Sequence, residues 1–156
     1  MAKFIDQGLV ELGERLGPIN WQFMETKKFE PEDFEGFLKL LPREAGKLPL
    51  RHALEVRNKS FMDPRFHDLA RKYNAAIVFA DHDEFPRIDE KTADFTYARL
   101  MRTQEGARTG YKPAELNSWA KTAKAWAARG DAFVYFISGA KVRNPAAAQA
   151  LIERVK

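Results

Sequence analysis

The sequence contains no cysteine among its 156 residues. This absence excludes disulfide bonds, cysteine-ligated zinc, iron–sulfur clusters and thiolate nucleophiles. Long hydrophobic runs are also missing, because the longest, at residues 75–80 and 132–137, are far shorter than the about 20 residues needed to cross a bilayer. The first residues do not lead into an apolar stretch with a cleavage site, so no secretory signal is predicted. We therefore expect a cytoplasmic protein without a membrane segment.

Several motifs that mark particular enzyme classes are absent as well. The sequence has no Gly-x-Ser-x-Gly elbow, no glycine-rich phosphate loop and no dinucleotide fingerprint, so it predicts no cofactor. Charge of either sign is not in large excess, since 26 Lys and Arg against 22 Asp and Glu leave a net charge of +4. With 45% hydrophobic and 31% charged residues and no linker or repeat, residues 1–156 are expected to form one folded domain.

The hydrophobic pattern predicts alternating helices and strands. Helical spacing of apolar residues, with proline and glycine at the ends, predicts helices over residues 4–16, 31–41, 61–73, 113–130 and 145–155. Alternating or continuous apolar segments predict strands over residues 18–24, 52–57, 75–81, 92–100 and 132–137. Because the strands are largely apolar and separated by helices, we expect an α/β fold with a mostly parallel sheet flanked by helices.

Four segments in the same order resemble the YecE-like family, known as domain of unknown function 72 (DUF72). They are residues 16–23 (LGPINWQF), residues 54–61 with Leu-Glu-Val-Arg and Ser-Phe, residues 92–100 (TADFTYARL), and residues 110–120 with Gly-Tyr, Glu-Leu and Trp-Ala. The resemblance implies a TIM-barrel-like fold, and it covers the later part of the family domain. Because such barrels need about 250 residues, we expect a partial barrel. Its open sheet edges would favour pairing with a second copy in a homo-oligomer.

In barrels of this kind the active site lies at the carboxyl ends of the strands. Glu55 and Arg57 lie two residues apart on one strand and therefore share a face, and Tyr97 and Arg99 repeat this arrangement. One interpretation is a structural ion-pair network that fills the barrel. The other is a site for an anionic, phosphate-bearing ligand. The candidate catalytic residues are Glu55 and Asp81, and the candidate ligand-binding residues are Gln22, Arg57, Tyr97, Arg99 and Lys141.

Two other patterns carry alternative functions. The acidic run of residues 81–84 could place one or two ligands on a divalent metal together with Glu55, but neighbouring residues of an extended chain point in opposite directions, which favours a solvated loop. Basic residues cluster around residues 99–112 and 141–156 near Tyr97 and Tyr111, as in a nucleic-acid-binding surface. A third hypothesis is a non-catalytic partial barrel that acts through self-association. The enzyme or enzyme-derived anion site ranks first.

Overall fold

The computed structural model describes residues 2–5 and 7–156. Its helices are α1 (Ala2–Ile5), α2 (Pro31–Lys39), α3 (Pro64–Lys72), α4 (Pro113–Ala127) and α5 (Asn144–Val155), with short 3-10 segments η1 (Leu9–Arg15), η2 (Lys59–Phe61) and η3 (Lys141–Arg143). Its strands are β1 (Ile19–Gln22), β2 (Glu44–Ala45), β3 (Leu48–Pro49), β4 (His52–Glu55), β5 (Ala76–Ile77), β6 (Phe79–Asp81), β7 (Phe95–Leu100) and β8 (Asp131–Phe136). No helix among these residues is long and apolar enough to cross a membrane.

The main strands form a parallel sheet whose spatial order follows the chain. β1, β4 and β5 pair in that order, and β6, β7 and β8 pair in that order, all in parallel. Only Val78 separates β5 from β6, and its N–H donates to the carbonyl of Leu54, so the two short strands continue one another. The predicted α/β fold with a parallel sheet flanked by helices is confirmed. Within the described residues the sheet does not close, so it is a partial, TIM-barrel-like arrangement.

The sheet is curved enough for residues of non-neighbouring strands to meet across its concave face. Arg51, directly before β4, donates from Nη1 to Asp131 Oδ2 of β8 at 2.7 Å. The Arg51 guanidinium also lies 4.6 Å from the centre of the Phe133 ring. Since β4 and β8 are not adjacent in the sheet, these contacts measure its curvature at the amino ends of the strands.

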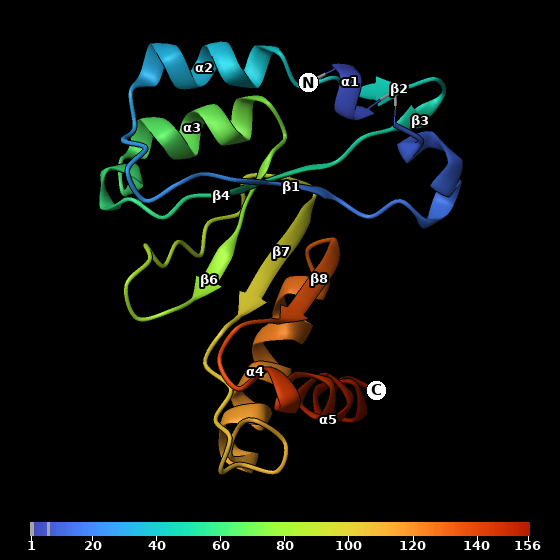
Figure 1. Cartoon of the computed structure of the whole chain (residues 1–156), viewed down its shortest axis with the longest axis vertical. Coiled ribbons are helices and arrows are strands. Elements are labelled where there is room, and N and C mark those ends of the chain that lie inside the picture. Colours follow the sequence, from blue (N-terminus) through green and yellow to red (C-terminus); the bar gives the residue numbers. More distant parts are fainter. Residues whose placement is uncertain (1, 6) are drawn as a thin grey trace.

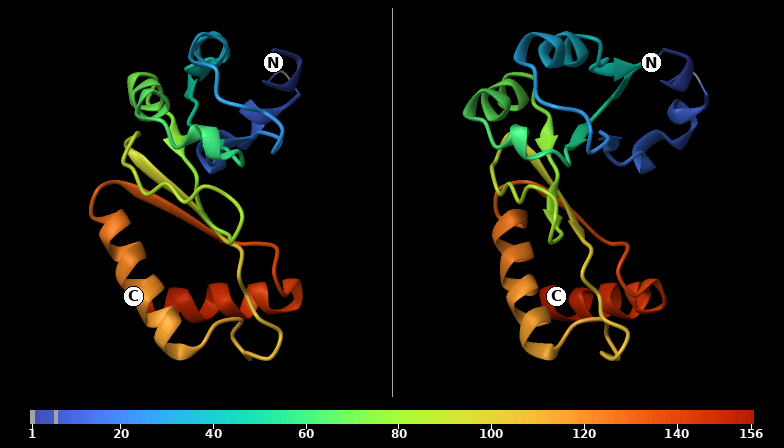
Figure 2. Two further views of the ribbon diagram at one scale, coloured as in Figure 1. Left: turned by 90° about the vertical axis from the view of Figure 1, so that its left-hand side faces the viewer. Right: turned by 60° about the vertical axis from the view of Figure 1, so that its left-hand side comes forward.

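Two helix pairs cover the convex face at opposite ends of the molecule (Figures 1 and 2). Helices α2 and α3 pack on β1, β4 and β5 through a phenylalanine cluster, in which the rings of Phe61 and Phe66 meet edge to face at 4.9 Å. Helices α4 and α5 pack on β6, β7 and β8, where Leu100, Leu116 and Trp126 are buried. The helices thus pack on the apolar face of the strands, and the polar residues of the same strands lie on the opposite, concave face.

The amino-terminal segment corrects one prediction. Helical spacing predicts a single helix over residues 4–16, but the structure has the short α1, then the 3-10 segment η1. Gly8 and Gly13 adopt positive φ angles of 95° and 52°, a region that interrupts regular helix and that glycine enters without a steric penalty. Asp6, which the prediction also includes, lies outside the described residues.

A second difference from the predicted elements is the hairpin of β2 and β3, which alternation does not mark. Its strands have two residues each and pair in antiparallel orientation. Its turn contains Gly46 at φ 61°.

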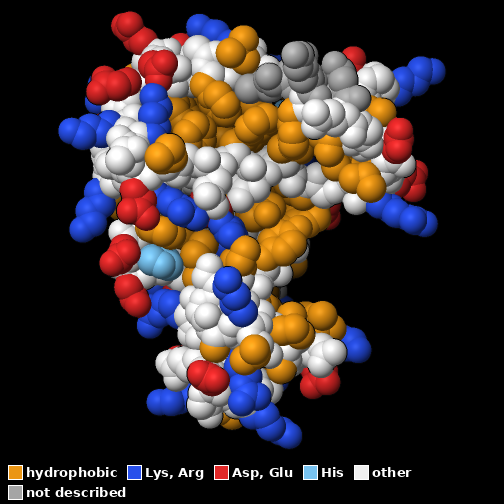
Figure 3. Space-filling view, viewed as in Figure 1, with side chains coloured by type: hydrophobic (Ala, Val, Ile, Leu, Met, Phe, Trp, Pro, Cys, Tyr) orange, Lys and Arg blue, Asp and Glu red, His pale blue; other side chains and the backbone are white. Residues whose placement is uncertain are grey.

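Hydrophobic side chains remain at the surface between the upper and lower parts of the molecule (Figure 3).

Candidate functional site

Glu55, the last residue of β4, is fully buried on the concave face of the sheet. Its Oε2 atom accepts a hydrogen bond from Asn20 Nδ2 at 2.8 Å and forms an ion pair with Arg99. Its Oε1 atom accepts from Arg57 Nη2 at 3.2 Å. The buried carboxylate therefore has three donors from three segments of the chain, and two of them are guanidinium groups.

Arg99 reaches Glu55 from β7, across the continuous strand made by β5 and β6. Its Nη1 also donates to Gln22 Oε1 at the end of β1, at 3.2 Å. Gln22, Glu55 and Arg99 thus come from β1, β4 and β7 and meet at one place. Of the candidate site residues, the structure brings Gln22, Glu55, Arg57 and Arg99 together at the carboxyl ends of the strands. With Asn20 they form a group that we name the arginine cluster.

The guanidinium group of Arg57 packs against a pair of stacked rings, Phe85 and His82. Its guanidinium carbon lies 4.7 Å from the centre of the Phe85 ring. The other side of this stack is His82, whose ring is nearly parallel to Phe85 with centroids 3.9 Å apart. The loop after β6 therefore covers one side of the arginine cluster and orients Arg57.

Two polar atoms of the arginine cluster are buried without a hydrogen-bond partner among the described residues. They are Arg57 Nε, a donor, and Asn20 Oδ1, an acceptor. Both residues also contact Glu55, so the two atoms flank the same carboxylate. A buried polar atom without a partner carries a desolvation cost of about 1–3 kcal/mol, and this cost is avoided when a ligand supplies the missing acceptor and donor.

Tyr97 lies on the same face of β7, two residues before Arg99. Its ring stacks on that of Tyr135 from β8, with centroids 5.0 Å apart. Burial raises the pKa of Tyr97 above its ordinary value, and the neighbouring Tyr135 adds to this shift. The Tyr97 hydroxyl is therefore uncharged at neutral pH. The side chain lies beside the arginine cluster, since the charges of Arg99 and Glu55 also act on its pKa.

Asp81 and Lys141 lie outside the arginine cluster. Asp81 follows Phe79 by two residues on β6 and points, like Phe79, to the convex side of the sheet. There its Oδ2 accepts from the Tyr111 hydroxyl at 3.4 Å. Lys141 begins η3 after β8 and is exposed. Their predicted roles in catalysis and ligand binding stay predictions.

Two members of the site were missed as candidates. Asn20 shares the alternation of Gln22 on β1, so the sequence contained a signal for it. Phe85 lies in a loop without periodicity, and no sequence pattern places its ring on Arg57.

The acidic residues of this loop include Asp83, whose Oδ1 lies 3.3 Å from Arg102 Nη1. Among the described residues no group of three or more His, Asp or Glu side chains is arranged to hold a metal ion.

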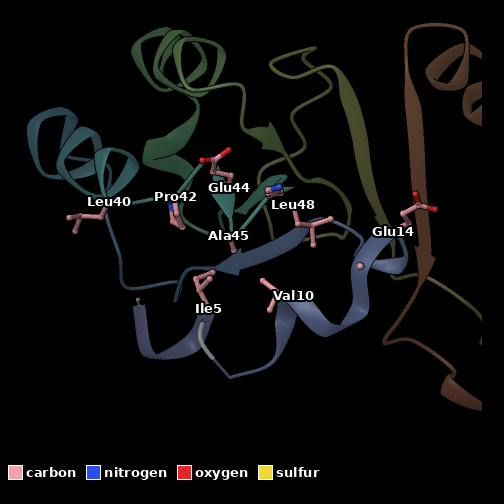
Figure 4. Close-up of a pocket in the computed structure, with 11 residues that line it drawn as sticks. Ile5, Val10, Glu14, Leu40, Pro42, Glu44, Ala45 and Leu48 are labelled. Atoms are coloured by element: carbon pink, nitrogen blue, oxygen red, sulfur yellow. The ribbon is translucent and has the colours of Figure 1, made fainter.

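A separate groove lies beside β1, at the edge of the sheet. It has a volume of about 850 Å³ and runs between the amino-terminal segment and the β2–β3 hairpin. Ile5 and Val10 face Ala45 and Leu48 across it (Figure 4). Because these residues precede β1 and β4 in the chain, the groove lies at the amino ends of the strands, away from the arginine cluster.

A curved parallel sheet with helices behind it and polar residues at its carboxyl ends defines an α/β protein of the partial-barrel class. The family model "Protein of unknown function DUF72" matches residues 1–156. The chain therefore belongs to the DUF72 family, as its sequence segments predicted.

Solved structures of the family share this fold. A DUF72 family protein from Thermotoga maritima is 19% identical with a TM-score of 0.72, and the match covers 97% of this chain and 62% of that one. A DUF72 family protein from Enterococcus faecalis is 16% identical with a TM-score of 0.72, covering 96% of this chain and 65% of that one. The chain thus spans less than two thirds of the length of either structure. A search of curated proteins found no match.

Proposed function

We propose that the arginine cluster binds a small anionic molecule through a phosphate or carboxylate group. The observation that carries the proposal is the pair of buried atoms without partners, Arg57 Nε and Asn20 Oδ1. A phosphate monoester with a neighbouring hydroxyl supplies both missing partners, because its anionic oxygens accept from arginine and its hydroxyl donates to an amide oxygen.

The charge of the cluster supports an anion. Two guanidinium groups surround one carboxylate, which leaves one positive charge uncompensated within the arginine cluster. The side chains of Arg57 and Arg99 are 24% and 10% exposed, so part of each remains accessible at the surface. Guanidinium groups bind phosphate and carboxylate with paired hydrogen bonds.

Glu55 has a different role from the arginines in this proposal. Its two oxygens already accept from Asn20, Arg57 and Arg99, so it fixes the orientation of the donors that meet the ligand.

Thermal unfolding in the presence of inorganic phosphate and ribose 5-phosphate tests the proposal. Ligand at 100 times its Kd stabilises the folded state by about 2.7 kcal/mol, and Arg57→Ala should abolish this stabilisation. Arg15→Ala, at an exposed position in η1, is the matched control and should keep it. An equal shift in Arg57→Ala and the parent protein would contradict the proposal, as would a response only to oligonucleotides with a steep salt dependence.

Self-association is the second candidate function, and the edge of the sheet favours it. β8 pairs with β7 on one side only among the described residues, and Tyr135 on this strand is 43% exposed. An edge strand with an exposed aromatic residue favours pairing with another strand. A second copy of the chain is the proposed occupant. Light scattering should then give about twice the 17.9 kDa chain mass, and Tyr135→Lys should reduce it to one chain; a parent protein of one chain mass at high concentration would rule this out.

A further inference from the structure

A second pocket lies on the convex side of the sheet, between the carboxyl end of β6 and the first turns of α4. Its volume is about 200 Å³, the space of roughly six or seven water molecules. Asp81, Arg87, Arg102 and Trp119 are among the residues that line it. The arginine cluster lies on the opposite face of the sheet, so the two sites are separate.

The carboxylate of Asp81 is buried in this pocket with few donors. Its side chain is 4% exposed, and its shortest hydrogen bond is the 3.4 Å contact from the Tyr111 hydroxyl. Arg87 Nη1 and Arg102 Nη1 each lie 3.8 Å from Asp81 Oδ1, which exceeds hydrogen-bond distance. Such long contacts only partly offset the cost of burying the Asp81 charge. A hydrogen-bond donor bound in the pocket would stabilise this carboxylate.

The two arginines are held by groups other than Asp81. The guanidinium of Arg87 lies 4.9 Å from the centre of the Phe79 ring and 5.8 Å from that of Trp119. Arg102 Nη1 is closer to Asp83, at 3.3 Å, than to Asp81. Both side chains are about half exposed, so their N–H groups are accessible to an anionic oxygen in the pocket.

The pocket carries charges of both signs. The acidic residues Asp81 and Glu115 and the basic residues Arg87 and Arg102 line it, and Asp83 lies beside Arg102. Burial raises the pKa of Tyr111 well above its ordinary value, so its hydroxyl stays uncharged and adds no charge. A ligand that matches this pocket presents a cationic donor to the Asp81 carboxylate and an anionic acceptor to the two arginines.

We propose that this pocket binds a free α-amino acid. The ammonium group donates to Asp81 and the carboxylate accepts from Arg87 and Arg102. Both groups are attached to the same carbon atom, which suits arginine nitrogens that lie 3.8 Å from the Asp81 oxygen. The pocket volume fits a small amino acid such as alanine, whose side chain points toward Trp119. This site does not depend on the anion site of the arginine cluster.

Calorimetric titration at neutral pH with L-alanine, ethylamine, propionate and inorganic phosphate tests the proposal. Alanine should bind, and ethylamine and propionate, which each lack one of its two charged groups, should bind at least tenfold more weakly. Asp81→Asn should weaken alanine binding by at least tenfold. If this variant fails to fold by circular dichroism, Arg102→Gln at a half-exposed position gives the same test. Arg129→Gln, exposed beyond the end of α4, is the control and should leave binding unchanged.

Three results would overturn the proposal. Binding of propionate or phosphate as tight as that of alanine, with tighter binding in Asp81→Asn, would show a simple anion site. Alanine binding that is unchanged in Arg102→Gln would place the ligand elsewhere. No heat of binding with alanine, glycine or L-serine at millimolar concentration would show that the pocket takes no free amino acid. None of these results bears on Arg57, so they are separable from failure of the anion site.

Discussion

Glu55 of β4 and Arg99 of β7 form an ion pair although their strands are not neighbours. The strand formed by β5 and β6 lies between them, so the pair spans the concave face. Strands separated by one other strand lie about 10 Å apart, and the long Arg99 side chain bridges this distance. The pair therefore joins two strands that are not adjacent and holds the arginine cluster together.

Replacing Glu55 tests the contribution of this pair to stability. Glu55→Gln keeps the shape of the side chain but leaves Arg57 and Arg99 without a negative partner. Removing one partner of a buried ion pair costs about 3–5 kcal/mol, so the free energy of unfolding in urea should fall by this amount. Asp68→Asn, which breaks the exposed pair with Arg71, should cost less than about 1 kcal/mol. Equal effects of the two substitutions would contradict the buried role of Glu55.

Much of the fold follows from the periodicity of the sequence. Leu54 and Val56 alternate with Glu55 and Arg57, so one face of the strand is apolar and the other charged, and the structure has the same two faces. Asp81 behaves differently because it ends a continuous apolar run. Such a run gives no alternation from which the face of its last residue can be predicted, and Asp81 points to the convex side.

The remaining differences depend on backbone conformation and loop contacts. The spacing of Leu9, Leu12 and Leu16 fits a helix, but the positive φ angles of Gly8 and Gly13 interrupt it. Likewise, the stacking of Phe85 on Arg57 depends on the path of a loop, which hydrophobic spacing does not encode. The residue types of the arginine cluster were thus predictable, and the aromatic cover was not.

His52 should make the stability of the protein depend on pH. Its Nδ1 accepts from Trp21 Nε1 at 3.0 Å, which leaves the proton on Nε2, 2.7 Å from the Pro42 carbonyl. Burial lowers the pKa of His52 below 6.5 despite the opposing effect of the Pro42 bond. As pH falls below 6.5, the unfolded chain gains a proton at His52 that the folded protein does not, so stability decreases until the lower folded-state pKa is reached.

Urea denaturation from about pH 7 to about pH 5 measures this effect. The His52 contribution to the slope is at most about 1.4 kcal/mol per pH unit. In His52→Gln, which has no titratable group at this position, the dependence should be flatter. A parent protein whose stability rises as the pH falls through this range would be inconsistent with the buried neutral imidazole.

Two glycines should respond to substitution in opposite directions. Gly130 has a φ of 143°, and a Cβ atom there would lie 2.0 Å from the Asp94 carbonyl oxygen. Gly130→Ala should therefore destabilise the protein by more than about 2 kcal/mol. In helix α2, a Cβ atom at Gly36 meets no atom within 4 Å, so Gly36→Ala should stabilise by about 0.5–1 kcal/mol. Thermal unfolding of both variants measures the two effects. A lower melting temperature in Gly36→Ala, or an unchanged one in Gly130→Ala, would contradict the prediction for that position.

Phe85 should affect anion binding through Arg57. Removing the ring in Phe85→Ala leaves the guanidinium without its aromatic partner, whose contribution is about 0.5–1 kcal/mol at an accessible site. Phosphate affinity should then fall by a factor of about 2 to 5. Ile152→Ala, at an exposed hydrophobic position of α5, should leave the affinity unchanged in the same calorimetric titration. Unchanged affinity in Phe85→Ala would show that the stack does not orient Arg57.

The most direct measurement of the anion site is the NMR signal of the Arg57 Nε–H group during titration with ribose 5-phosphate. In the structure this donor is buried without an acceptor among the described residues. We predict that its resonance moves with saturation behaviour and becomes protected from solvent exchange as the ligand binds, while the Arg15 signal stays in place. An Arg57 resonance that does not respond at ligand concentrations that shift other arginine signals would contradict the account.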